Sequence, residues 1–134
     1  MALFNLYDQE LVLSETTIPQ VKLYQQGPAC GKLKAIHVTV NPPEEIVHAQ
    51  GGQLGHTPLA PEIKVNGATL YVNGSSDAPN GDTVLYYPVY GSSISEVANV
   101  IVRAPYYLVE NKETGNLSIK YKEVTIKRID CEWE

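Results

Sequence analysis

The chain has 134 residues, enough for one domain with a single core, and we assign residues 1–134 to it. A net charge of −5, with 19% charged residues, argues against a nucleic-acid partner, because binding to a phosphate backbone depends on clustered lysine and arginine. No apolar run approaches the ~18 residues of a membrane helix, and the first residues lack the basic and apolar segments of a signal peptide. We therefore expect a soluble protein with no signal peptide and no membrane partner.

The composition favours short strands joined by many turns. Glycine (10), proline (9) and tyrosine (9) are plentiful, whereas phenylalanine, tryptophan and methionine occur once each. Short apolar runs flanked by proline, glycine or charge predict edge strands at residues 2–7, 10–13 and 20–25. Residues 1–8 are also a candidate extended arm.

Residues 32–40 predict a half-buried strand. Ile36 and Val38 alternate with His37 and Thr39, so one face is apolar and the other is mixed. The strand ends before two consecutive prolines, and an irregular glycine-rich region follows at residues 50–61. A loop of this length is usually functional, which makes it a candidate contact surface around its single Leu54.

The strongest local signal is Asn66-Gly67, which joins β-favouring runs at residues 62–65 and 68–72. Both residues tolerate the positive φ of a two-residue type I′ turn, so a β-hairpin is expected. Residues 73–82 are dense in turn residues. Residues 83–90 predict a strand with Tyr86 on one face and Tyr87 on the other.

The C-terminal third predicts mostly strands. Ser93-Ile94-Ser95-Glu96 has the spacing of a capping box, so residues 94–103 are expected either as one short helix or as a strand through Val100. A second hairpin is expected from residues 106–110 and 117–122. In residues 124–133 the apolar positions shift phase between Ile126 and Ile129, which predicts a bulge near residues 127–128.

These elements predict an all-β, antiparallel fold. Eight to ten short strands separated by turns are typical of a β-sandwich, a jelly roll or a small barrel, here with the alternative short helix near residues 94–103. We find no internal repeat and no linker in the sequence.

The sequence contains little that points to catalysis. His37, His48 and His56 are spaced too far apart for a local metal motif, and no serine lies in a nucleophile elbow. A calcium turn at residues 77–82 departs from the EF-hand pattern. Cys131 alternates with apolar residues and is expected in the core, and it and Cys30 are expected as free thiols. We therefore expect no cofactor, no metal and no enzymatic activity.

The tyrosines point instead to contact with protein, since a tyrosine can bury its ring while its hydroxyl stays in water. The leading hypothesis is a structural subunit that binds copies of itself or a larger protein lattice, in its most concrete form a virion decoration or cement subunit; otherwise a cytoplasmic location is expected. The candidate contact residues are Leu3, Phe4, Leu6, Tyr7, Leu54, Tyr86, Tyr87, Tyr90, Tyr106 and Tyr107.

Two other classes of function stay open at this stage. A carbohydrate-binding β-sandwich would use Tyr86, Tyr90 and Trp133 as faces for sugar stacking. A metal-dependent, cupin-like enzyme would need the scattered histidines to converge in the fold.

Overall fold

The computed structural model describes residues 2–14, 20–21, 24–29, 31–41, 60–90 and 94–134. Within these ranges the protein contains fourteen strands and no helix, and so no helix that could cross a membrane. The strands are β1 (Ala2–Tyr7), β2 (Leu11–Leu13), β3 (Gln20–Val21), β4 (Gln25–Gln26), β5 (Leu33–Val40), β6 (Glu62–Val65), β7 (Ala68–Leu70), β8 (Ser75–Asp77), β9 (Thr83–Pro88), β10 (Glu96–Val97), β11 (Val100–Arg103), β12 (Tyr106–Glu110), β13 (Leu117–Tyr121) and β14 (Val124–Trp133).

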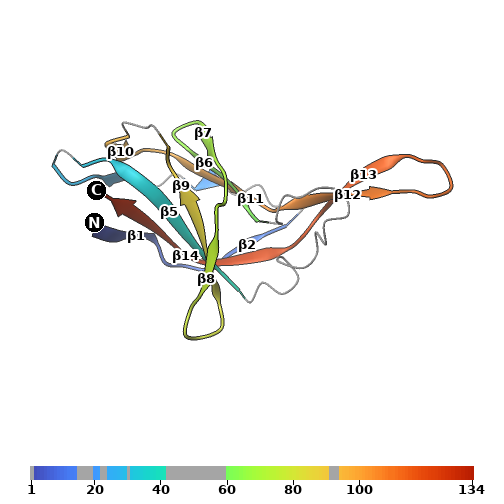
Figure 1. Ribbon diagram of the computed structural model, residues 1–134, viewed down its shortest axis with the longest axis horizontal. Helices are drawn as coiled ribbons and strands as arrows, with labels where there is room; N and C mark the ends of the chain where they lie inside the picture. The colour runs from blue at the N-terminus through green and yellow to red at the C-terminus, as the bar shows by residue number, and fades with distance from the viewer. Residues whose placement is uncertain (1, 15–19, 22–23, 30, 42–59, 91–93) are drawn as a thin grey trace.

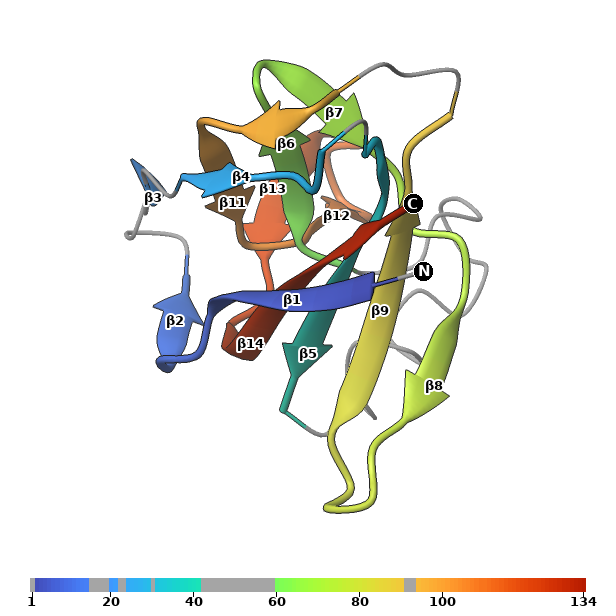
Figure 2. The ribbon, with the colours of Figure 1, turned by 90° about the vertical axis from the view of Figure 1, so that its left-hand side faces the viewer.

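Two antiparallel sheets form the body of the molecule (Figures 1 and 2). The large sheet has the order β1-β14-β5-β9-β8, with β2 also paired to β14, and the small sheet has the order β3-β11-β6-β7. Two short strands, β4 and β10, pair with each other, and β12 pairs with β13 in a separate hairpin. The predicted all-β, antiparallel fold is confirmed, although the structure describes fourteen strands where eight to ten short ones were expected.

The core lies between the two sheets, because each presents one face of alternating apolar residues. On the large sheet Ile36 pairs with Cys131 and Tyr87, and all three side chains are buried. On the small sheet Val100 pairs with Val65, again both buried. The predicted core position of Cys131 is confirmed, and its thiol is free. Burial of such side chains is worth roughly 1.5–3 kcal/mol each, so this interior dominates the stability of the fold.

The predicted bulge in the last strand is confirmed. Ile126 pairs with Val40 and Arg128 pairs with Thr39, which leaves Lys127 as the extra residue. Without this insertion Ile126 and Ile129 would face opposite sides of the sheet; with it, both are fully buried. The bulge therefore keeps the ten-residue strand β14 in the core along its length.

The hairpin at Asn66-Gly67 is also confirmed. The two residues have φ values of 51° and 86°, the left-handed conformation that a type I′ turn requires. The Asn66 side chain donates to the Glu96 carbonyl (2.9 Å) and accepts from the Ala98 amide (2.8 Å). The turn therefore also fixes the segment that leads into β11.

Of the two alternatives for residues 94–103, the strand through Val100 is confirmed and the short helix is wrong. This stretch forms β10 and β11, with Val97 and Val100 buried. The Asn66 side chain accepts from the Ala98 and Asn99 amides, which a helix would have needed for its own bonds. Pairing with β6 also gives β-branched Val100 and Val102 a buried face, so tertiary burial overrides the capping-box pattern.

Two other segments differ from expectation. Residues 73–82 are not only a turn, because β8 pairs there with β9. All three β8 residues are exposed, so this edge strand forms through its backbone and leaves no hydrophobic pattern in the sequence. The candidate arm at residues 1–8 contains β1, which pairs with β14 of the same chain.

Candidate protein-interaction site

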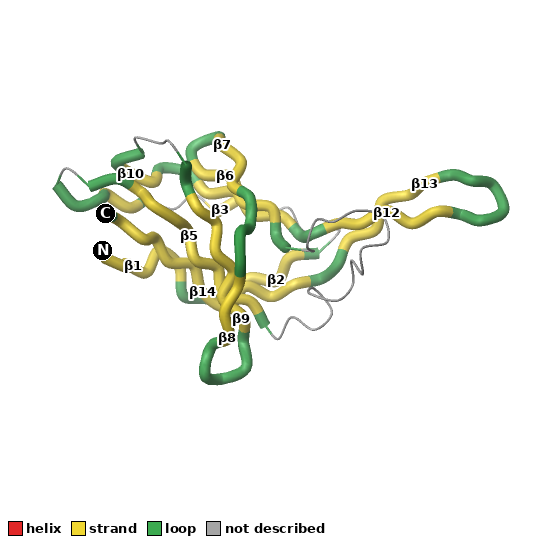
Figure 3. Tube along the Cα trace, in the orientation of Figure 1, coloured by secondary structure: helices red, strands yellow, loops and turns green. Residues whose placement is uncertain are grey.

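The hairpin of β12 and β13, called the arm below, projects from one end of the body (Figures 1 and 3). It continues β11 of the small sheet and leads into β14 of the large sheet. At its base Ala104 and Pro105 are buried, and the Lys122 amide donates to the Pro105 carbonyl (2.9 Å). At its tip the Asn111 amide donates to the Asn116 carbonyl (2.8 Å). In the described part of the chain, neither arm strand pairs with a strand of the body.

One face of the arm is apolar and exposed to solvent. Leu117, Ile119 and Tyr121 alternate with Ser118 and Lys120 along β13, so the apolar side chains share one face. Their exposed fractions are 60%, 52% and 43% respectively. Tyr106 is opposite Tyr121 and adds its ring to this face, with the two ring centroids 6.3 Å apart. We call Tyr106, Leu117, Ile119 and Tyr121 the apolar face of the arm.

The described side chains of the arm gain little stability from burial. An isolated two-stranded hairpin is at best marginally stable in water, because it has no second layer to cover its apolar residues. All five residues of β13 are exposed, yet three of them are large and apolar. Contiguous exposed apolar surface of this kind is a candidate interaction surface. A partner that covers this face would supply the missing layer.

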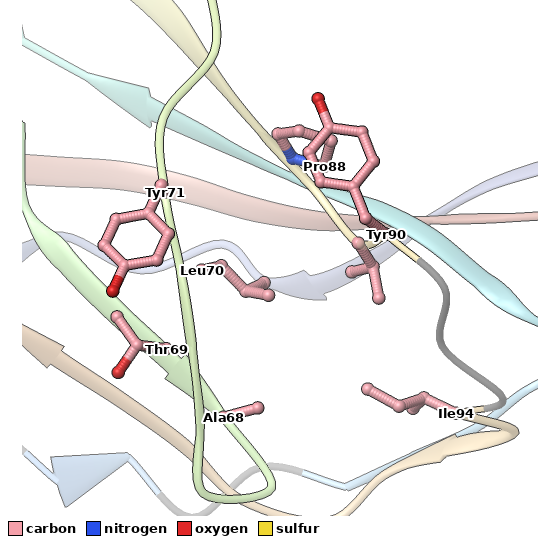
Figure 4. A pocket seen from close by; sticks show the side chains of 8 residues that line it. Ala68, Thr69, Leu70, Tyr71, Pro88, Tyr90 and Ile94 are labelled. Atoms are coloured by element: carbon pink, nitrogen blue, oxygen red, sulfur yellow. The ribbon is translucent and has the colours of Figure 1, made fainter.

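A second apolar surface lies where β7 and β9 end. A hollow of about 280 Å³ is lined mainly by apolar side chains, and Tyr71 and Tyr90 lie on either side of Leu70 there (Figure 4). Both rings are 76% exposed, and the Asn73 amide donates to the Tyr90 hydroxyl (3.0 Å). Among the described residues, no carboxylate, imidazole, thiol or amine lines the hollow. Its chemistry therefore favours binding over proton transfer.

The structure separates the candidate contact residues into several groups. Tyr106 lies on the arm and Tyr90 at the hollow, whereas Leu3 and Phe4 are exposed on β1 at the edge of the large sheet. Leu54 and the side chain of Tyr107 lie outside what the structure describes. The remaining two N-terminal candidates are partly buried against the core: Leu6 and Tyr7.

The expectation that Tyr87 contacts a partner is wrong. Its side chain is 1% exposed and its hydroxyl donates to the Pro61 carbonyl (2.7 Å). Burial raises the pKa of Tyr87 far above its usual value of 10.0. Tyr86 points to the opposite face of the strand, where it is half-buried and meets the ring of His37 edge-on at 5.2 Å. Strand alternation therefore divides this tyrosine pair as predicted, with one residue in the core.

The apolar residues of β13 were not singled out from the sequence. Their period-two alternation was a visible signal, and the hairpin itself was predicted. Such alternation normally means that one face is covered by a second sheet, so it points to a core. Only the three-dimensional arrangement shows that the described chain leaves this face uncovered.

Two clusters of charged and polar side chains lie on the outer face of the large sheet. His37 Nε2 is 2.7 Å from Glu132 Oε1, and Lys34 Nζ is 3.5 Å from the other carboxylate oxygen. Arg128 Nε donates to Asp130 at 2.8 Å, and Asn5 donates to the same carboxylate at 3.2 Å. These contacts satisfy two carboxylates that are only 5% exposed.

The structure brings together no metal site from the described residues. His48 and His56 lie outside the described ranges. The structure therefore does not test whether the three histidines converge, as a cupin-like enzyme would need. In the turn at residues 77–82, Asn80 accepts from the Asp82 amide (3.1 Å) and donates to the Asp82 carboxylate (2.9 Å). These bonds close the turn on itself.

The sugar-stacking role expected for Trp133 is wrong, because its ring is 0% exposed. Tyr90, which is 76% exposed, is therefore the one exposed aromatic residue of that set. Comparison with protein-family models, with curated proteins and with solved structures finds no match to this chain. The geometry of the arm and of the hollow is thus the basis for assigning a function.

Proposed function

We propose that the protein is a non-enzymatic structural subunit that binds a protein surface through the apolar face of its arm. The observation that carries this proposal is the pair of β12 and β13, which stands apart from both sheets of the body with large apolar side chains in water. The partner is a copy of the same chain or a larger protein lattice. The most concrete form is a small virion decoration subunit.

The chemistry of the arm favours a protein partner. A flat apolar face beside open backbone edges fits another β-rich protein surface, which can cover the side chains and add a strand. The net charge of −5 disfavours a nucleic acid. The hollow between Tyr71 and Tyr90 is lined by groups suited to binding, which agrees with a role without catalysis.

Site-specific photo-crosslinking tests this proposal in the native source of the protein. A photoreactive phenylalanine analogue is placed at position 121, on the apolar face, and in a matched control at position 24, an exposed tyrosine of the body next to β4. We expect protein adducts from position 121 and few from position 24, because only the first position lies at the proposed contact. Mass spectrometry of the adducts identifies the partner as the same chain or another protein.

The control removes effects of exposure and residue type, since Tyr24 and Tyr121 are both exposed tyrosines and only Tyr121 lies on the arm. Equal adduct yields from the two positions, or no protein adduct from position 121, would show that the apolar face is not a docking surface.

A second function is favoured by one observation, the two exposed tyrosine rings beside the hollow (Figure 4). Aromatic rings with a flanking amide such as Asn73 suit a carbohydrate, because sugars stack on rings and bond to polar groups at their rim. A sugar site there predicts that Tyr90→Ala abolishes any rise in melting temperature across a panel of sugars. Tyr106→Ala, which removes an exposed ring far from the hollow, serves as control. Silence of the wild-type protein across the panel contradicts the sugar site.

A further inference from the structure

The outer edge of β13 carries its backbone groups in a defined pattern. The Lys122 amide and the Asn116 carbonyl both bond to the β12 side of the hairpin. In an antiparallel pair the bonding direction alternates along the strand, so the even-numbered residues of β13 point their N–H and C=O groups toward β12. The odd-numbered residues, which are Leu117, Ile119 and Tyr121, point theirs away. In the described part of the chain no strand pairs with this edge.

The β13 strand is complementary to itself in one antiparallel register. When two copies pair about a two-fold axis at Ile119, Leu117 lies opposite Tyr121 of the second copy and Ile119 lies opposite its counterpart. These are the residues whose backbone groups point outward, so each such pair exchanges two hydrogen bonds. They are also the apolar residues, so the apolar faces of the two arms become continuous.

The charges agree with this register. Lys120 lies opposite Ser118 of the second copy, which avoids contact between like charges. A two-fold axis at Lys120 would instead set the two lysines against each other, and an axis at Ser118 would leave Tyr121 opposite Gly115 in the tip. The edge of β12 is poorer, because an axis at Leu108 sets Glu110 opposite Tyr106.

We propose that the partner of the arm is a second copy of this chain, whose β13 pairs with β13 antiparallel about a two-fold axis at Ile119. The product is a four-stranded sheet made of two arms, with both copies of the apolar face on one side. This inference rests on the proposed docking function and names the protein that docks on the arm. Three or more strands with an apolar face reach the stability that a lone hairpin lacks, so pairing explains why the arm exists as an ordered hairpin.

Two substitutions at one position test the register. Ser118→Lys sets a lysine opposite Lys120 of the partner at two symmetric places, and Ser118→Glu sets an opposite charge there. We expect the dissociation constant of the dimer to rise with lysine and fall with glutamate, each by roughly 2- to 30-fold from two cross-strand charge pairs. Sedimentation velocity over a concentration series measures it. Both variants leave the apolar face intact, and their difference should shrink at high salt.

Amide hydrogen exchange supplies an independent readout on the unmodified protein. The Leu117, Ile119 and Tyr121 amides should exchange slowly only at concentrations where the dimer forms. The Ser118 and Lys120 amides point inward to β12, so their protection should depend less on concentration than that of the three outward amides.

The outcomes separate this inference from the docking function. A monomeric wild-type chain, or lysine and glutamate variants with equal dissociation constants, overturns the β13 pairing. If crosslinking at position 121 then captures a different protein, the docking function stands while its occupant changes. If crosslinking at position 121 captures nothing, both fail.

Discussion

Replacing Trp133 by alanine is expected to lower the free energy of unfolding by about 3–5 kcal/mol, the range for deleting a buried aromatic ring. The ring is 0% exposed, and its Nε1 donates to Gln25 Oε1 at 2.8 Å, which ties β4 to the end of the large sheet. A cavity would result, and Gln25 Oε1 would lose its hydrogen-bond donor. Urea denaturation followed by circular dichroism measures the change.

Two variants serve as controls for this effect. Trp133→Phe keeps an aromatic ring but loses the bond to Gln25, so a smaller loss is expected. Tyr106→Ala removes a ring that is 54% exposed on the arm and should stay within about 0.5 kcal/mol of wild type, as surface substitutions usually do. A loss in Trp133→Ala no greater than in Tyr106→Ala would contradict the core role of Trp133.

Stability is expected to fall steeply as the pH rises above 9. Burial, followed by the nearby charge of Asp130, raises the pKa of the Cys131 thiol from 9.0 to about 12. In the unfolded chain this thiol ionises near its ordinary pKa, whereas the folded chain holds the proton. The stabilising effect is thus complete below pH 9 and is lost as the pH rises toward 12, by about 1.4 kcal/mol per pH unit and about 4 kcal/mol in total.

Tyr87 adds to this loss at higher pH. Burial raises the pKa of its hydroxyl far above 10.0, so the same sign applies and its share begins near pH 10. The effects of Cys131 and Tyr87 can therefore be distinguished by the pH at which each begins to lower the free energy of unfolding.

Urea denaturation at several pH values under reducing conditions tests both assignments. Cys131→Ala should lower stability at pH 7 through its cavity and flatten the decline between pH 9 and 10. Both proteins keep Cys30, so the difference between them belongs to Cys131. Tyr87→Phe should keep the decline above pH 9 but reduce its steepness above pH 10. A decline in Cys131→Ala as steep as in wild type would show that the thiol is not the group responsible.

Local chemistry in the sequence determined much of the fold. Asn66-Gly67 predicts its turn because these residues adopt positive φ at low cost, whatever packs around them. Alternation around Ile36 and Val38 predicts β5 because a strand turns successive side chains to opposite faces. The phase shift between Ile126 and Ile129 predicts the bulge for the same reason. Each of these signals is complete within a few residues.

The tertiary structure alone decided which faces are covered. The stretch at residues 94–103 satisfies a helix pattern locally, and only pairing of Val100 with Val65 makes it a strand. Strand β8 forms from exposed polar residues by backbone pairing, which leaves no pattern to read. Burial of Tyr87 and exposure of Tyr121 also depend on contacts between distant segments. Alternation along a strand shows which side chains share a face. Whether that face is buried, and how much stability its burial adds, depends on the segment that packs against it. For the arm, the described chain supplies no such layer, and this is why its apolar face is the candidate site.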